Sequence, residues 1–305
     1  MDREELCVVT GAFGYTGKYI TRRLISSGKR VLTLTGHPGR DNTFGDRVSI
    51  APFCFDNPDR LAESMRGATT FFNTYWVRFP YGGVTYGTAV ENTRILIDSA
   101  ARAGVRRIVH VSITNAFEES PLPYFKGKGI LEREIVNSGL SYSIIRPTVI
   151  FGPEDILINN IAWLLRRFPV FVVPGTGEYR LQPVFVEDMA EIAVNASERQ
   201  DNCIIDAVGP EIYTFNQLLN LIAEKVKSRA RIVHLRPGLA LFLSGLVGLM
   251  VKDVVLTGDE VRGLMAGLLV SREQATGKTM LSDWLDKNRH TVGSVYASEL
   301  KRHYR

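Results

Sequence analysis

The chain has 305 residues, of which 45% are hydrophobic and 23% are charged, and this composition is typical of a folded globular protein. The formal net charge is +5, but the basic residues are scattered and form no long run, which argues against a nucleic-acid partner. The three cysteines Cys7, Cys54 and Cys203 are widely spaced and odd in number, which excludes a disulfide scaffold and a zinc finger.

The sequence also lacks several targeting and metal-binding patterns. No apolar run approaches the length of about 18 residues that a membrane-spanning helix needs. The N-terminal segment is acidic and continues directly into a strand, so no secretory signal is expected. His234, His290 and His303 have no acidic or cysteine partner at ligand spacing. We therefore expect a cytoplasmic protein without a metal site.

The first half of the chain alternates short β-branched runs with helical patterns, which is typical of a doubly wound α/β sheet. Helices are predicted at 17–27 and 92–103, and each is followed by a glycine, Gly28 or Gly104, that suits the left-handed position past a helix end. Right-handed crossovers would place the strands in one parallel, Rossmann-type sheet. The predicted strands are 6–10, 30–35, 48–55, 69–73, 107–111 and 141–145.

After residue 152 this alternation stops, and the elements become irregular in order. We expect a dinucleotide-binding Rossmann domain over 1–158, continued by 183–208. A smaller, interleaved C-terminal substrate (cap) domain would comprise 159–182 and 209–305. Predicted elements of this half are helices at 159–168, 187–196 and 214–227, and extended segments at 179–186 and 203–208.

Residues 239–251 of the predicted cap domain carry no charge. Three interpretations are open: packing in the core, the apolar wall of a substrate pocket, or an interfacial helix in peripheral contact with a membrane. The absence of charge favours burial, and either buried arrangement predicts a small-molecule substrate with an apolar part. Arg180 and Gln182 are the polar residues expected near the other end of that substrate.

The strongest motif lies between the first strand and the first helix. Gly11, Gly14 and Gly17, with Phe13, Tyr15 and Thr16 among them, follow a strand and open a helix. Glycines in this context let backbone amides and a helix N-terminus approach a pyrophosphate. The motif therefore predicts dinucleotide binding, with a purely structural turn as the alternative.

The end of the second predicted strand favours NADP, with NAD as the alternative. NAD-binding domains usually place an acid there to hold the ribose hydroxyls, whereas this chain has no acid before Asp41. His37 and Arg40 are candidates to contact a 2′-phosphate. After the third strand, Asp56 is a candidate to accept from an adenine amine, and Asn57 and Pro58 suit the start of a helix.

Tyr124 and Lys128 form the candidate catalytic pair. On a helix they lie one turn apart on the same face, and a nearby ammonium lowers a tyrosine pKa toward neutrality. The alternative is a tyrosine that contacts the cofactor or only packs. His110 lies within a strand and is interpreted as a structural side chain rather than a base.

The segments TGAFGYTG, VHVSITN, YFKGK and RPTVIFGP together resemble the short-chain dehydrogenase/reductase superfamily, in its atypical or extended, epimerase/dehydratase-like branch. Within that branch the chain is similar to the Rossmann-type accessory subunit of respiratory complex I and its single-chain relatives. The segments LSDWL and YASEL near the C-terminus share this similarity.

The resemblance implies a role for each matching position. Tyr124 would be the acid/base, Lys128 would bind the nicotinamide ribose, and Thr114 would supply the partner hydroxyl, with Ser112 as the fallback. Thr114 replaces the usual serine and stands only ten positions before Tyr124, a shorter spacing than in active extended enzymes. Other residues implied at the cofactor are Asn73, Thr74, Tyr75, Asn92, Pro147, Thr148 and Val149.

These observations predict an NADP-dependent oxidoreductase that acts on a partly apolar carbonyl or alcohol, with Tyr124 also touching the substrate. One alternative is a structural or sensor protein that binds NADP(H) without turnover. Another is an epimerase or dehydratase acting on a nucleotide sugar. The resemblance also suggests a homodimer built on helices that begin near Asn92 and Tyr124.

Overall fold

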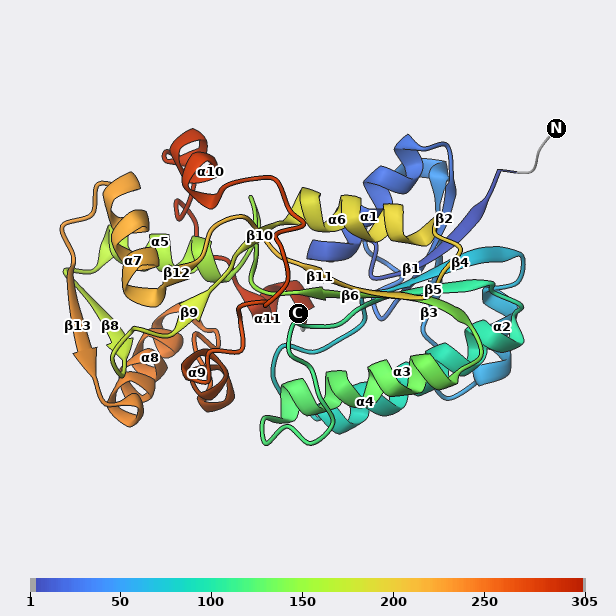
Figure 1. The fold of residues 1–305 in the computed structure, drawn as a ribbon, viewed down its shortest axis with the longest axis horizontal. Helices are drawn as coiled ribbons and strands as arrows, with labels where there is room; N and C mark the ends of the chain where they lie inside the picture. The colour runs from blue at the N-terminus through green and yellow to red at the C-terminus, as the bar shows by residue number, and fades with distance from the viewer. Residues whose placement is uncertain (1–3, 304–305) are drawn as a thin grey trace. The chain divides into compact units, whose positions relative to one another are not determined.

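The computed structural model describes residues 4–303, which divide into two units (Figure 1). The first unit comprises the chain up to residue 146 together with 189–205, and the second comprises 147–188 and the chain from 206 onward. The sequence placed the corresponding boundaries at 158, 182 and 208. The structure assigns 147–158 to the second unit because Phe151 and Ile158 are part of its hydrophobic core.

The first unit is built on a seven-stranded sheet with the order β11-β6-β5-β4-β1-β2-β3. The pairs β1–β2, β2–β3, β1–β4, β4–β5 and β5–β6 are all parallel, as the alternating pattern of the sequence predicts. The strands are β1 (Leu6–Thr10), β2 (Arg30–Thr35), β3 (Val48–Pro52), β4 (Ala68–Asn73), β5 (Arg107–Val111), β6 (Ser141–Pro147) and β11 (Cys203–Ala207).

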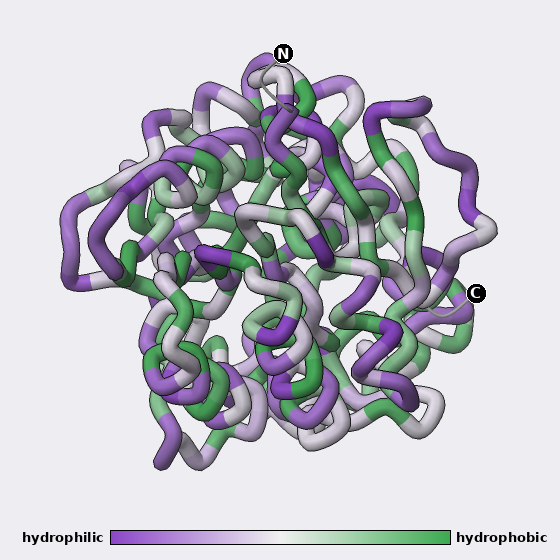
Figure 2. The backbone as a smooth tube through the Cα atoms, turned by 90° about the vertical axis from the view of Figure 1, so that its right-hand side faces the viewer, coloured by the Kyte–Doolittle hydropathy of each residue, from purple (hydrophilic) through white to green (hydrophobic). Residues whose placement is uncertain are grey.

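Helices cover both faces of this sheet (Figure 1). They are α1 (Tyr15–Ser26), α2 (Pro58–Ser64), α3 (Tyr86–Arg102), α4 (Pro123–Asn137) and α6 (Val186–Ser197), with a 3₁₀ turn η1 at Gly45–Arg47. On one face, Val8, Phe71 and Ile108 of the strands form a buried cluster with Leu96 of α3 and Ile135 of α4. Figure 2 shows hydrophobic and hydrophilic residues recurring within successive turns of the helices, the pattern that gives a helix one apolar face to bury.

In the first unit, two element boundaries differ from the sequence prediction by three residues or more. Strand β3 ends at Pro52 instead of continuing to Phe55, and Cys54 has a φ of +44°, which is incompatible with a strand. Helix α3 starts at Tyr86, six positions before Asn92, because the Thr85 side chain accepts the N–H of Thr88 and caps the helix. Asn92 therefore lies inside α3.

The buried Arg107 side chain links several chain segments at one edge of the sheet by hydrogen bonds. Its side chain is 2% exposed, and the guanidinium donates to the carbonyl oxygens of Ala196 at 3.2 Å, Tyr142 at 3.0 Å and Asp201 at 2.8 Å. It also donates to Ser143 Oγ at 2.6 Å. These acceptors lie on β6, α6 and the segment before β11, so one buried cation joins three parts of the chain.

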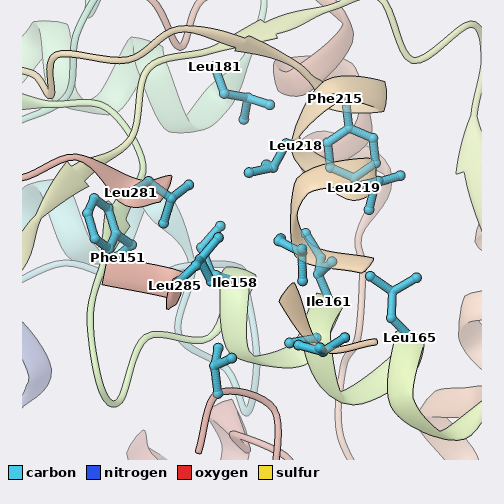
Figure 3. Packing of buried hydrophobic residues seen from close by; sticks show 14 of the residues in the cluster. Phe151, Ile158, Ile161, Leu165, Leu181, Phe215, Leu218, Leu219, Leu281 and Leu285 are labelled. Carbon is cyan, nitrogen blue, oxygen red and sulfur yellow. The ribbon is translucent and has the colours of Figure 1, made fainter. Parts of the chain in front are cut away.

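The second unit combines short strand pairs with helices around its own core. Its elements are β7 (Ile150–Phe151), α5 (Leu157–Arg167), β8 (Val170–Pro174), β9 (Arg180–Leu181), β10 (Val184–Phe185), β12 (Tyr213–Thr214), α7 (Phe215–Lys225), β13 (Arg231–Leu235), α8 (Pro237–Val251), α9 (Gly258–Met265), α10 (Leu281–Asn288) and α11 (Glu299–His303). Strands β8 and β13 pair in parallel, as do β7 and β10, while β9 and β12 are antiparallel. Figure 3 shows side chains from α5, α7 and α10 meeting in the core, among them Ile161, Leu218 and Leu285.

Helix α8 contains the uncharged segment 239–251, and its burial differs from the expectation. Leu249 is 78% exposed and Phe242 is 63% exposed, so the interpretation as core packing is wrong for these side chains, whereas Leu241 and Leu243 are half-buried. An uncharged segment can lie in an apolar environment, but the sequence does not show whether that environment is the protein's own core or something outside the chain. Within residues 4–303, no helix combines the length and apolarity needed to cross a bilayer.

We predict that Arg107→Met will lower the free energy of unfolding by about 2–4 kcal/mol, because several buried acceptors would lose their donor. Urea denaturation followed by circular dichroism measures the change. Arg106→Met is the matched control. Arg106 is exposed and directly precedes Arg107 in the chain, so its replacement should change stability by less than about 0.5 kcal/mol. Equal effects from the two variants would contradict this role for Arg107.

Candidate functional site

The turn after β1 has a backbone that only glycine fits. Gly11 has a φ of +65°, and its N–H donates to the carbonyl oxygen of Leu34 at 2.8 Å. A Cβ atom on Gly17 would lie 2.2 Å from the carbonyl oxygen of Gly11, whereas a Cβ atom on Gly14 would lie 3.1 Å from it. The turn therefore depends most strictly on Gly17, because fixed backbone occupies the space that a side chain would need.

Helix α1 opens from this turn without a side-chain cap. Its N-cap residue, Gly14, has no side chain to accept from the first-turn amides, and that turn holds no acidic residue. Such amides carry partial positive charge and suit a phosphate group. The turn thus fits a dinucleotide pyrophosphate. Phe13 stacks on Phe44 with ring centroids 6.3 Å apart, and Tyr15 and Thr16 form the start of the helix.

Reciprocal hydrogen bonds join the carboxyl ends of β1 and β4. The Thr74 N–H donates to Thr10 Oγ1, and Thr74 Oγ1 donates to the carbonyl oxygen of Thr10, each at 2.6 Å. Thr10 Oγ1 in turn donates to Asn73 Oδ1 at 3.2 Å. The strand order reverses between β1 and β4, and ligands of doubly wound sheets bind outside the carboxyl ends at such a reversal. These bonds therefore hold the expected ligand site in place.

The network continues to His110 on β5. Asn73 Oδ1 accepts the N–H of Tyr75 at 3.1 Å, so the Asn73 amide nitrogen faces His110 Nδ1, 3.1 Å away. Because an amide nitrogen only donates, Nδ1 is the acceptor and Nε2 carries the hydrogen. Burial, together with the charge of Lys128, holds the pKa of His110 well below its usual value. His110 is therefore a neutral structural residue, in keeping with its interpretation from sequence.

Lys128 is a buried lysine on α4. It is 2% exposed, and its Nζ donates to the carbonyl oxygen of Val111 at 2.7 Å. Burial lowers the pKa of Lys128 to about 7, and the Glu132 carboxylate opposes part of that shift. The Nζ also lies 4.5 Å from the centroid of the Trp76 ring, which favours the charged form. Near neutral pH this amine exchanges a proton far more readily than an exposed lysine does.

Tyr124 and Lys128 both contact Trp76. The Tyr124 ring meets the indole edge-on with centroids 5.7 Å apart, and it meets Tyr86 in the same manner at 5.9 Å. Gly127 makes room for this contact, because a Cβ atom there would lie 2.7 Å from the indole. The structure thus brings the predicted pair together around an aromatic residue that directly follows Asn73, Thr74 and Tyr75.

Neither predicted partner hydroxyl has its hydrogen free. Thr114 is completely buried, and its Oγ1 donates to the carbonyl oxygen of Arg146 at 2.8 Å. Ser112 Oγ donates to Glu132 Oε1 at 2.5 Å, and Arg146 Nε donates to the same carboxylate oxygen at 2.9 Å. Thr114 as placed can accept a hydrogen bond, but it cannot also donate one to a substrate oxygen.

The loops after β2 and β3 carry the candidates for cofactor selection. His37 is exposed and Arg40 is partly exposed in the loop that follows Thr35, and Asp56 is exposed in the loop before α2. Asn57 caps α2 by accepting the N–H of Arg60 at 3.0 Å, so the neighbouring acid is left to solvent.

Beside these loops, Phe53 and Phe55, which the sequence did not single out, join the predicted cofactor residue Tyr75 in an aromatic group. Phe53 and Phe55 stack with centroids 4.9 Å apart, and Tyr75 meets Phe53 edge-on at 5.2 Å. Asn92 donates to the Tyr75 hydroxyl at 2.8 Å and so positions that ring. Phe53 and Phe55 were placed inside the predicted strand 48–55, so no sequence signal indicated that they lie in a loop beyond the strand.

Two buried donors near Lys128 lack an acceptor among the residues that the structure describes. They are Trp76 Nε1 and His110 Nε2. Buried N–H groups are rarely left unsatisfied, so a bound molecule with acceptor oxygens suits this place. Sequence reasoning did not find Trp76, because a tryptophan in a loop carries no pattern of its own.

Some of the predicted site residues in the second unit already form hydrogen bonds within the protein. Pro147 ends β6, Val149 packs against the core of the second unit, and Thr148 Oγ1 donates to the carbonyl oxygen of Gln182. The Gln182 side chain is 4% exposed, donates to Gly209 O at 2.9 Å and accepts the N–H of Ser271 at 3.1 Å. A substrate contact by Gln182 would require breaking these bonds, whereas Arg180 is exposed on β9.

Residues 11–155 match the family model described as NAD(P)H-binding. The chain is 22% identical over 285 residues to subunit 9 of the NADH dehydrogenase [ubiquinone] 1 alpha subcomplex of Arabidopsis thaliana, mitochondrial, a match covering 87% of this chain and 71% of that protein. It is 24% identical to the NADH-ubiquinone oxidoreductase 40 kDa subunit of Neurospora crassa, mitochondrial, with 89% of this chain and 74% of that protein covered.

Solved structures share the fold at low sequence identity. A nucleoside-diphosphate-sugar epimerase from Staphylococcus aureus superposes with a TM-score of 0.75 at 16% identity, covering 92% of this chain and 99% of that one. An NADPH-dependent quinone oxidoreductase from Escherichia coli, complexed with NADPH, gives a TM-score of 0.75 at 19% identity with the same coverage. These likenesses confirm the Rossmann-type α/β fold.

The comparisons correct the expected location. Both curated relatives are named as mitochondrial proteins, which points away from the cytoplasm and makes the cytoplasmic expectation wrong. The physical reason is that the lack of a secretory pattern concerns export only and does not distinguish among the compartments inside a cell.

We predict that Gly17→Ala will weaken NADPH binding by about 10- to 100-fold, because the new methyl group must displace the backbone around Gly11. Isothermal titration calorimetry measures the affinity. Gly87→Ala is the control, since a Cβ atom on that exposed helical glycine makes only an ordinary contact at 3.5 Å. Unchanged affinity in Gly17→Ala would remove the turn from the binding site.

The buried Lys128 predicts a pH dependence of stability. Its pKa is about 7 in the folded chain and 10.5 when exposed in the unfolded chain. Between these values the unfolded chain holds a proton that the folded chain lacks, so stability rises as the pH increases from about 7 to about 10. Lys128→Met should lose this part of the rise in urea titrations, and Lys126→Met, which alters an exposed lysine of the same helix, should keep it.

Proposed function

Because this chain contains an NAD(P)-binding Rossmann domain and is homologous to subunit 9 of the NADH dehydrogenase 1 alpha subcomplex, we propose that it is an NADP-dependent oxidoreductase. Its substrate is a carbonyl or alcohol compound with an apolar part. The observation that carries this proposal is the pairing of Tyr124 with the buried Lys128 around Trp76, next to the network that holds the glycine turn.

Tyr124 acts as the proton donor in reduction and the proton acceptor in oxidation. The half-exposed Tyr124 hydroxyl stands one helical turn from Lys128, whose pKa of about 7 lets it take up or release a proton during the cycle. A positioned acid/base of this kind contributes about 10²–10⁴ in rate. When bound, the nicotinamide supplies or accepts the hydride.

The surroundings of Tyr124 favour an apolar substrate. Trp76 and Tyr86 contact the Tyr124 ring, and they offer flat apolar surface on which a hydrocarbon or quinone-like ring can pack. The indole N–H of Trp76 is a donor suited to the substrate oxygen. An NADPH-dependent quinone oxidoreductase among the structures of similar fold is in keeping with this choice.

NADP is the proposed cofactor. The loop after β2 holds His37 and Arg40 and no acid before Asp41, so a 2′-phosphate meets the Arg40 guanidinium and the His37 ring rather than a carboxylate. Phe53 and Phe55 offer an apolar surface beside that loop for the adenine ring, with Asp56 available to its amine.

A second function is favoured by the state of Thr114. Its hydroxyl hydrogen is donated to the carbonyl oxygen of Arg146, and that of Ser112 is donated to Glu132, so neither of the two expected hydroxyls can help to polarise a substrate carbonyl. A protein that binds NADP(H) without turnover, as a subunit or sensor, needs no such donor. The homology to subunits of a larger assembly makes protein partners part of this second candidate.

We predict that Tyr124→Phe will lower NADPH-dependent turnover by about 10²–10⁴-fold while NADPH affinity stays within about twofold. A panel of aldehydes, ketones and quinones, with NADPH oxidation followed by absorbance, identifies the substrate. Tyr142→Phe, a tyrosine change on β6, is the control and should retain turnover. Full turnover in Tyr124→Phe would exclude the mechanism. NADPH that binds the native chain, with no compound of the panel reduced, would support the non-catalytic function.

A further inference from the structure

The large side chains of α8 project outward from the second unit. Leu239, Phe242, Leu246, Leu249 and Met250 recur at the spacing of one helical face, which we call the α8 outer face. Their exposed fractions run from 49% for Leu239 to 78% for Leu249. The helix therefore displays its bulkiest apolar residues rather than burying them.

The inner side of α8 combines small residues with the half-buried Leu241, Val247 and Val251. Ala240 and Gly248 are buried, and Ser244 lies on the same helical face between them. A Cβ atom on Gly248 would lie 2.7 Å from the carbonyl oxygen of Asp253, so the turn that follows the helix leaves no room there for a side chain. An ordinary surface helix presents polar residues to water, whereas α8 presents large apolar residues.

The outer face is costly to leave in water. Full burial of a Leu, Phe or Met side chain is worth about 1.5–3 kcal/mol each, and contiguous apolar patches on soluble proteins mark contact sites. None of the five side chains can form a strong hydrogen bond, whereas interfaces between proteins mix aromatic and arginine anchors with a hydrogen-bonding rim. A hydrocarbon layer therefore complements the α8 outer face better than a protein surface does.

The charges at the ends of α8 are cationic. Arg236 is the N-cap residue, Lys252 is the C-cap residue, and both are exposed. The acids next along the chain are occupied, because Asp253 is buried and accepts the N–H groups of Glu299 and Leu300, and Asp259 pairs with Arg262. Positive charge flanking an apolar face complements the anionic headgroups of a lipid surface.

We propose that the α8 outer face docks on the surface of a bilayer that contains anionic phospholipid. The 15 residues of α8 extend about 22 Å at 1.5 Å per residue, which is less than the roughly 30 Å hydrocarbon core, so the helix lies along the surface rather than across it. Phe242, Leu246 and Leu249 enter the boundary between headgroups and acyl chains, and Arg236 and Lys252 remain among the phosphates. This proposal does not depend on the catalytic activity of the other unit.

Vesicle flotation with the full chain tests the proposal. The native chain should float with vesicles of phosphatidylcholine mixed with phosphatidylglycerol, and more weakly with phosphatidylcholine alone. The double variant Phe242→Gln/Leu249→Gln should bind the mixed vesicles at least about tenfold more weakly, since two inserted side chains are lost. Val295→Gln changes a residue that is 75% exposed outside α8 and should bind as the native chain does.

The double variant Arg236→Gln/Lys252→Gln separates charge from apolar contact. It should reduce binding to the mixed vesicles to the level seen with phosphatidylcholine alone. NADPH affinity and thermal midpoint, measured on every variant, should match the native values and so exclude unfolding as the cause.

Three results would overturn the proposal. The first is a native chain that stays with the aqueous fraction in both vesicle preparations. The second is equal loss of binding in Val295→Gln. The third is a dimer, seen by light scattering, that Phe242→Gln/Leu249→Gln dissociates without changing flotation; this would assign the outer face to a second copy of the chain.

Discussion

The contact between the backbone of Gly17 and the carbonyl oxygen of Gly11 is the constraint on which the first unit's site depends. It sets where α1 begins, and thereby aims an uncapped helix N-terminus at the reversal point of the sheet. The reciprocal bonds between Thr10 and Thr74 hold the neighbouring strand end at the same place. A local backbone approach and two hydrogen bonds between residues 64 positions apart thus fix this edge of the sheet.

From that edge a row of buried polar groups leads to the candidate catalytic residues. Thr10, Asn73 and His110 are joined by hydrogen bonds, and the charge of Lys128 acts on His110. Among the described residues, His110 Nε2 at the end of this row and the nearby Trp76 Nε1 have no hydrogen-bond acceptor. Buried donors of this kind suit a bound molecule, and in the proposed function the glycine turn and the Tyr124–Lys128 pair would serve that molecule together.

Glycine residues allow close backbone contacts in both units, but with different results. In the first, Gly17 allows the close approach to the Gly11 backbone, and Gly127 allows the contact with Trp76. In the second, Gly248 allows the tight turn at Asp253 that ends α8, a helix whose bulky residues Phe242 and Leu249 are exposed. The first arrangement suits a small molecule, whereas the second suits an extended surface.

Periodicity in the amino-acid order is enough to derive the parallel sheet, its glycine turn and the spacing of Tyr124 and Lys128, because strands, tight turns and helical faces depend on near neighbours. It misses the early start of α3, which rests on the Thr85 cap, and the place of Trp76, which no repeat marks. Only the folded chain shows that the Thr114 hydroxyl hydrogen is already used in a hydrogen bond, and which side of α8 is exposed to water. The hydroxyl depends on Arg146, and the helix depends on the rest of the second unit. These groups are distant in sequence, so a local sequence pattern cannot predict either contact.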